Sequence, residues 1–239
     1  MLRPLALLVL LHASASTGTP GTSGNSGSTG SSGSTGTAGT LGTIGDVGTK
    51  PWKAIRATAL ARSTVPLWLD LSRIAGDTLP HDLLPDLLMG PLLVGVVGLD
   101  LRGQAVGSEG AKAIAATDQL RALQVLRLSN AQLDEAGVRA IAYAQNLQAL
   151  VFLDLSGNPG SPLGTSELSK AAWVPHLVHL DLRNTPPPTV DAARTLGERL
   201  VRVEVLHVDG AWPAAVLDAL REGLGDRVGA LIVESPPTE

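Results

Sequence analysis

Three stretches of the chain share one pattern: residues 120–128 read LRALQVLRL, residues 147–155 read LQALVFLDL, and residues 174–182 read VPHLVHLDL. Each has leucine or valine at its first, fourth, seventh and ninth positions. Successive side chains of a β-strand alternate between the two faces of a sheet, so the last two apolar side chains of each stretch point to the same face. Each stretch is therefore predicted to end in a short, half-buried strand.

The same pattern recurs in weaker form before and after these stretches. Its last apolar position falls at Leu71, Leu101, Leu128, Leu155, Leu182, Val208 and Val233. Subtracting neighbours gives steps of 30, 27, 27, 27, 26 and 25 residues. A nearly constant period of this length is typical of a stacked repeat, in which each unit buries its apolar face against the next. The spacing predicts seven such units.

Helical spacing of apolar residues lies between the predicted strands, at residues 110–115, 136–142, 167–172 and 213–220. Side-chain oxygens that could cap these or neighbouring helices are found at Ser108, Asp134, Thr165 and Thr189. A strand, a helix and a second strand parallel to the first form a right-handed crossover. The chain is therefore predicted to be an α/β protein built from repeated crossovers.

These residues resemble a known family. The leucine template, together with VGSEGA at residues 106–111 and LDEAGV at residues 133–138, is similar to the leucine-rich repeat of the ribonuclease-inhibitor-like subtype. The resemblance implies a right-handed solenoid with about seven short parallel strands on its concave face, helices on its convex face, and protein recognition as its task. The family's loop asparagine is present only at Asn158; the equivalent positions hold Ile74, Gln104, Ala131, Thr185 and Ala211. The ladder of buried amides is therefore expected to be incomplete.

The chain ahead of the repeats divides into three segments. Residues 1–15 combine a basic start, an apolar run and a small-residue cleavage pattern, which together predict a signal peptide. Residues 16–49 are rich in Gly, Ser and Thr and are predicted to be a disordered tether. Residues 50–64 are predicted to form an N-terminal capping helix, and residues 65–239 the repeat domain. A working signal predicts a secreted or cell-envelope protein, in the periplasm or on the surface; without one, the protein is expected to be cytoplasmic.

The composition argues against nucleic-acid binding, cysteine chemistry and a membrane span. The net charge of -4, with 18 basic and 22 acidic residues, supplies no basic stripe for phosphates, so no nucleic-acid partner is expected. The absence of cysteine excludes disulfides, thiolate metal sites and a cysteine nucleophile. The apolar stretch at residues 83–101 is interrupted by Asp86 and Pro91, so no membrane span is expected once the signal is removed.

The strand template assigns side chains to the predicted concave face. One row carries aspartates that could attract a basic partner, or that are simply solvated consensus residues. The next row carries apolar side chains at Trp68, Val125 and Phe152, which could anchor a partner or turn inward under a loop. The candidate binding residues are Trp68, Asp70, Asp100, Arg102, Val125, Arg127, Phe152, Asp154, His179, Asp181, Arg183 and His207.

Four residues could form a metal or catalytic site, or only a structural or surface pair: His179, Asp181, His207 and Asp209. No third group is fixed beside them and no nucleophile lies at a set offset, so neither a catalytic residue nor a metal or cofactor is predicted. We therefore predict a non-enzymatic module that binds another protein through its concave face. The alternative is a structural or adhesive envelope component that is attached by its low-complexity arm. No cap follows Val233, so the last strand is predicted either to pair with a second copy of the chain or to belong to a longer parent chain.

Overall fold

The computed structural model of the chain describes residues 10–13, 67–72, 83–89, 93 and 95–234. The predicted tether at 16–49 and the capping helix at 50–64 lie outside the described residues. So does the predicted signal peptide at 1–15, apart from residues 10–13.

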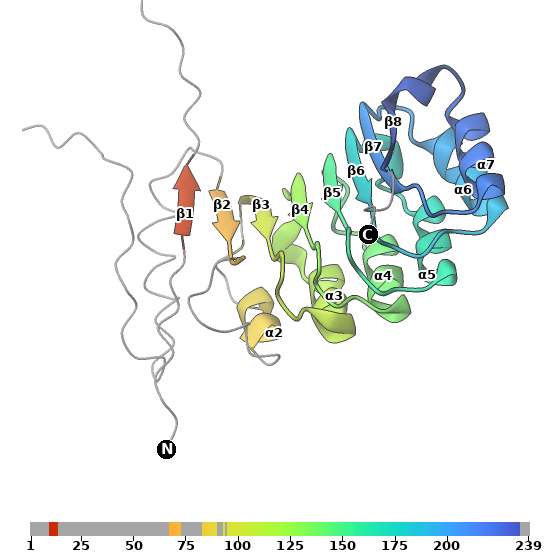
Figure 1. Cartoon of the computed structure of the whole chain (residues 1–239). Helices are drawn as coiled ribbons and strands as arrows, with labels where there is room; N and C mark the ends of the chain where they lie inside the picture. Colours follow the sequence, from red (N-terminus) through yellow and green to blue (C-terminus); the bar gives the residue numbers. More distant parts are fainter. Residues whose placement is uncertain (1–9, 14–66, 73–82, 90–92, 94, 235–239) are drawn as a thin grey trace, which may run out of the picture.

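The strands form one open sheet in which their order follows the chain (Figure 1). Seven of them, β2 to β8, pair in parallel, and β1 pairs antiparallel with β2. This arrangement confirms the predicted α/β class. The pairing of β1 was not predicted. The strands are β1 (Leu10–Ala13), β2 (Leu67–Asp70), β3 (Val96–Asp100), β4 (Val125–Arg127), β5 (Phe152–Asp154), β6 (His179–Leu182), β7 (Val205–Asp209) and β8 (Leu231–Glu234).

One face of the sheet packs against the helices and holds the core. The leucines of the template align from strand to strand; Leu126 pairs with Leu153, and Leu153 with Leu180. All three are fully buried. The helices lie on that side of the row of strands in Figure 1. They are α2 (Leu83–Met89), α3 (Gly107–Ala116), α4 (Glu135–Ala142), α5 (Pro162–Glu167), α6 (Val190–Arg199) and α7 (Ala214–Leu224), with 3-10 turns at 118–120, 168–170, 174–176 and 225–230.

Two of the predicted helix caps are confirmed. The Asp134 carboxylate accepts a hydrogen bond from the Gly137 amide at 2.8 Å, and the Thr189 hydroxyl accepts one from the Ala192 amide at 3.3 Å. Each side chain satisfies an amide that has no partner inside the first helical turn.

The other two predicted caps are wrong. Helix α3 begins earlier than expected, so Ser108 lies inside its first turn and its hydroxyl donates to the Asp134 carboxylate at 2.5 Å. Helix α5 also begins earlier, because Ser161 caps it and a proline follows directly. Thr165 therefore lies within α5, and the predicted helix at 167–172 is a 3-10 turn at 168–170.

The Asn158 side chain joins the loop after β5 to the loop after β4. Its amide group donates to the carbonyls of Leu128 and Leu155 at 2.8 and 2.7 Å, and its carbonyl accepts from the amides of Ala131 and Leu133 at 3.0 Å. The side chain is 1% exposed, so these loop groups have no access to water. At the next equivalent position, the Thr185 hydroxyl donates to the Leu182 carbonyl at 2.7 Å.

A series of side-chain hydrogen bonds, which the sequence did not predict, joins the end of each helical segment to the next unit. This series is called the helix-end ladder. In each case a side chain donates to backbone carbonyls about one repeat earlier, in the last turn of a helical segment or just after it. Threonine, asparagine and tryptophan each serve once as the donor, and arginine serves twice. The pairs are Thr117 to Leu88, Asn146 to Ile114 and Thr117, Trp173 to Ile141, Arg199 to Ser169 and Ala171, and Arg227 to Leu200.

The apolar stretch at residues 83–101 contributes helix α2 and strand β3. Within the described ranges, none of the helices has the length and apolar character that crossing a bilayer requires.

Candidate binding face

The face of the sheet opposite the helices is called the open face here. Its side chains form three rows that run across the strands, as the strand registers define. The first row is Trp68, Gly98, Val125, Phe152, His179 and Val205; the second is Asp70, Asp100, Arg127, Asp154, Asp181, His207 and Ile232; the third is Ser72, Arg102, Ser129, Ser156, Arg183, Asp209 and Glu234. The fold therefore places all twelve predicted binding residues on one face.

The aspartates of the second row cap the ends of their own strands. Asp70 accepts hydrogen bonds from the amide and the hydroxyl of Ser72 at 2.9 and 2.6 Å. Asp154 does the same with Ser156, at 3.0 and 2.7 Å. The amide of Arg183 likewise donates to Asp181 at 3.0 Å. This local bonding, typical of aspartate two residues before its donor, explains why the row is aspartate-rich.

Two aspartates of this row are neither free nor solvated. Asp100 is 1% exposed and Asp181 is 3% exposed, so the alternative of a simply solvated row is wrong for these two residues. Arg102 Nε lies 2.9 and 3.0 Å from the two carboxylate oxygens of Asp100. Arg183 forms the equivalent pair with Asp181, with its Nη2 at 2.5 Å from Oδ2. The Asp181 carboxylate raises the pKa of the Arg183 guanidinium, because it favours the charged form.

Trp68 takes the space that Gly98 leaves empty on the neighbouring strand. A Cβ atom at Gly98 would lie 2.3 Å from Trp68 Cε3, well inside van der Waals contact. The Arg127 guanidinium reaches the indole from β4, at 5.5 Å from the ring centroid, and also lies 5.3 Å from the Phe152 ring. Arg127 therefore joins the two aromatic side chains through cation–π contacts, and it lies 3.5 Å from Asp100.

Phe152, the only phenylalanine of the chain, stacks on the next strand's imidazole. The Phe152 and His179 rings have centroids 4.2 Å apart and planes 8° apart. His207 follows at 5.6 Å from His179, tilted by 44°. The series Trp68, Arg127, Phe152, His179 and His207 is called the ring ladder below. Its members are all half-buried.

Glu234 of β8 ends the ring ladder. Its Oε1 lies 2.8 Å from Arg183 Nη1 and 3.4 Å from His207 Nδ1. The second distance is not a hydrogen bond, because Nδ1 is buried and forms no hydrogen bond with any described residue. Burial, and next the neighbouring His207, lower the pKa of His179. His179 therefore stacks on Phe152 on one side and contacts the tilted ring of His207 on the other. The described residues hold no cluster of three or more side chains that could ligate a metal.

The remaining first-row residue of the predicted patch, Val125, is half-buried between Gly98 and Phe152. The prediction missed Ser72, Ser156 and Glu234. The two serines belong to a motif, Asp-Leu-Ser or Asp-Leu-Arg, that is visible in the sequence at the end of four strands. It also missed the pairing of Trp68 with Gly98, for which the sequence holds no signal.

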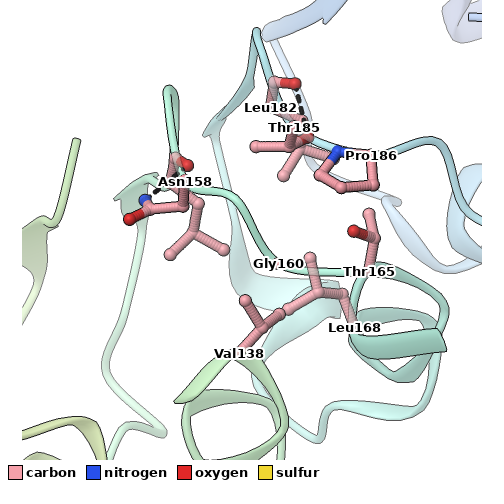
Figure 2. A pocket seen from close by; sticks show the side chains of 9 residues that line it. Val138, Asn158, Gly160, Thr165, Leu168, Leu182, Thr185 and Pro186 are labelled. Atoms are coloured by element: carbon pink, nitrogen blue, oxygen red, sulfur yellow. Dashed lines mark hydrogen bonds between the residues drawn. The ribbon is translucent and has the colours of Figure 1, made fainter. Parts of the chain in front are cut away.

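A small cavity lies on the other side of the sheet, between the loop after β5 and helix α5 (Figure 2). The space that a water molecule's centre can occupy is about 10 Å³, which is the lower limit for one water. Its polar members, Asn158, Thr165 and Thr185, all form hydrogen bonds inside the protein. The cavity therefore belongs to the core and is not a ligand site.

Compared with models of known protein families the chain matches none, and a search of curated proteins likewise found no match. Its function is therefore inferred from the open face alone.

Proposed function

We propose that this chain is a leucine-rich-repeat protein that binds another protein on the open face of its sheet, without catalysis. The repeat assignment rests on the in-register leucines of successive parallel strands and on the bonding of Asn158. In this assignment the sheet is the inner wall of a right-handed solenoid, and the open face is its concave surface.

The observation that carries the proposal is the ring ladder. Its side chains are already ordered by contacts with one another, since Arg127 lies between two rings and Phe152 stacks on His179. A surface whose side chains are fixed in advance loses little conformational entropy on binding. Aromatic and arginine side chains are also the types that dominate measured binding energy at protein interfaces.

The charge of the open face indicates the partner's chemistry. Its second and third rows hold six carboxylates, from Asp70, Asp100, Asp154, Asp181, Asp209 and Glu234, against the guanidinium groups of Arg102, Arg127 and Arg183. Asp154 also has one carboxylate oxygen, Oδ2, that accepts no hydrogen bond from the described residues. The surplus of negative charge favours a partner with a basic contact surface.

The non-catalytic part of the proposal rests on Ser156, which carries a hydroxyl in the third row of the open face. Ser156 Oγ donates to Asp154 at 2.7 Å. A serine nucleophile needs a base that accepts its proton and a group that orients that base. Here the serine hydroxyl completes a strand-end turn.

The test uses the full chain as bait in its native source, beside the variant Phe152→Asp/Val125→Lys. We expect a basic protein that the wild-type chain captures and the variant loses. The control is Leu163→Asp on helix α5, where leucine is 61% exposed on the helical side. A captured protein is then purified, and its affinity is measured at two salt concentrations, with weaker binding expected at higher salt. Equal binding by wild type and the open-face variant, with unchanged circular dichroism, would refute the proposal.

A further inference from the structure

The last strand leaves core positions uncovered. Val228, Leu231 and Val233 occupy the places that Val203, Leu206 and Val208 hold one unit earlier. The earlier three are 6%, 0% and 0% exposed. By contrast Val228 is 44% exposed, and Leu231 and Val233 are only half-buried.

The same strand offers an open hydrogen-bonding edge. β8 pairs with β7 on one side, and no described strand pairs with its other side. An edge strand that carries apolar residues and lacks a lysine or proline is open to pairing with another strand. The single charge of β8 does not guard the edge, because Arg183 pairs with the Glu234 carboxylate over the open face at 2.8 Å.

We propose that two copies of this chain join through β8, antiparallel and related by a two-fold axis at Ile232. The occupant must be a strand, since it has to meet unpaired backbone groups, and it must bring apolar side chains to cover Leu231 and Val233. β8 itself meets both requirements. Two-fold symmetry pairs a surface with itself, so one strand supplies both halves of the interface.

The register follows from the alternation of side chains. Directly opposed residues of an antiparallel pair point to the same face, so an inward residue must oppose an inward residue. With Ile232 opposite Ile232 of the second copy, Leu231 opposes Val233 on the helix-covered face. A pairing centred on Val233 would place Leu231 opposite Ser235 and bring Pro236 towards the ladder, where proline has no donor.

Electrostatics favours the antiparallel direction. In this register each Glu234 opposes Ala230 of the other copy, and the two carboxylate-bearing residues are about 14 Å apart along the strands, beyond the screening distance of about 8 Å at physiological salt. A parallel in-register pair would instead stack one Glu234 on the other. The joined sheet keeps both open faces on the same side, so the dimer does not use the surface proposed for the protein partner.

The test is the mass of the full chain in solution over a range of concentrations, measured by sedimentation equilibrium. We expect a weight-average mass that rises from one chain towards two. Ile232 is 42% exposed, so Ile232→Lys and Ile232→Glu should fold normally. Each variant alone should weaken association at least tenfold, because like charges face each other on the axis. An equimolar mixture of the two should associate again, as opposite charges then meet.

The control is Leu163→Lys, which should dimerise like the wild type. A strictly single-chain mass at the highest concentration would overturn the proposal, as would a dimer that Ile232→Lys and Ile232→Glu leave unchanged. Two variants that stay monomeric when mixed would overturn the Ile232 axis. Amide hydrogen exchange gives a second readout: the outward amides of β8 should exchange more slowly as the concentration of the wild type rises.

Discussion

The ring of Phe152 and the imidazole of His179 lie parallel, 4.2 Å apart, because their strands pair with these two residues directly opposite each other. A stack of this kind is a packing contact across the sheet, and its geometry is set by the register and by the spacing of the strands. It orders the centre of the open face before any partner binds.

The stack makes the fold sensitive to acid. Burial, with His207 as the next cause, lowers the pKa of His179 below its ordinary value of 6.5. Below pH 6.5 the unfolded chain therefore binds a proton that the folded chain resists, so stability should fall as the pH drops from 6.5 towards the folded pKa. The pKa is measured by NMR titration of the imidazole, and urea unfolding gives stability at each pH. The groups that face this imidazole include His207, Asp181, Asp154 and Arg183.

The control for this prediction is His179→Phe, which keeps an aromatic ring on Phe152 and cannot be protonated. This variant should lose the part of the pH dependence that belongs to His179. A wild-type pKa at or above 6.5 would contradict the prediction.

Trp68 and Gly98 should depend on each other. Gly98→Ala inserts a methyl group 2.3 Å from an indole carbon, so the indole must move, and we expect a cost of about 1–3 kcal/mol. In a chain that already carries Trp68→Ala the same change should cost little, because the space is then empty. A double-mutant cycle by urea unfolding measures this coupling. Equal costs in both backgrounds would show that the indole does not fill this space.

Asn158 should be among the most costly polar side chains to remove. Asn158→Ala leaves buried carbonyls and amides without partners, and we expect a loss of about 2–4 kcal/mol in the free energy of unfolding. The matched control is Asn184→Gly. Asn184 is exposed and has φ of 51°, a conformation that glycine adopts without strain. The control should change stability by less than about 0.5 kcal/mol.

The helix-end ladder predicts a second sensitive position. The Arg199 guanidinium donates to the carbonyls of Ser169 and Ala171, at 2.5 and 2.8 Å. Arg199→Met keeps much of the apolar stem and removes both donors, so we expect a loss of about 1–3 kcal/mol. Arg202→Met, three residues away on an exposed position, is the control and should have little effect. Equal thermal stability of the two variants would count against the ladder.

Much of the architecture was predictable because it follows from local patterns that repeat along the sequence. The spacing of leucines predicted seven strands, and the alternation within each strand placed all twelve candidate residues on one face. The caps were predicted less well. Ser108 and Thr165 are suitable residue types, but the start of each helix depends on packing that the sequence alone does not show.

By itself, then, the sequence determined the strand order, the buried leucine rows and the surface on which binding is proposed, since each follows from the period of side chains along the backbone. Only the tertiary structure decided how the side chains of that surface contact one another and how deeply they are buried. In the tertiary structure Asp100 and Asp181 are buried and paired with arginines, and Trp68 packs over Gly98. Phe152 stacks on His179, and Val228 remains exposed. These outcomes depend on which side chains the registers bring together between units about 27 residues apart, and no local pattern encodes that choice.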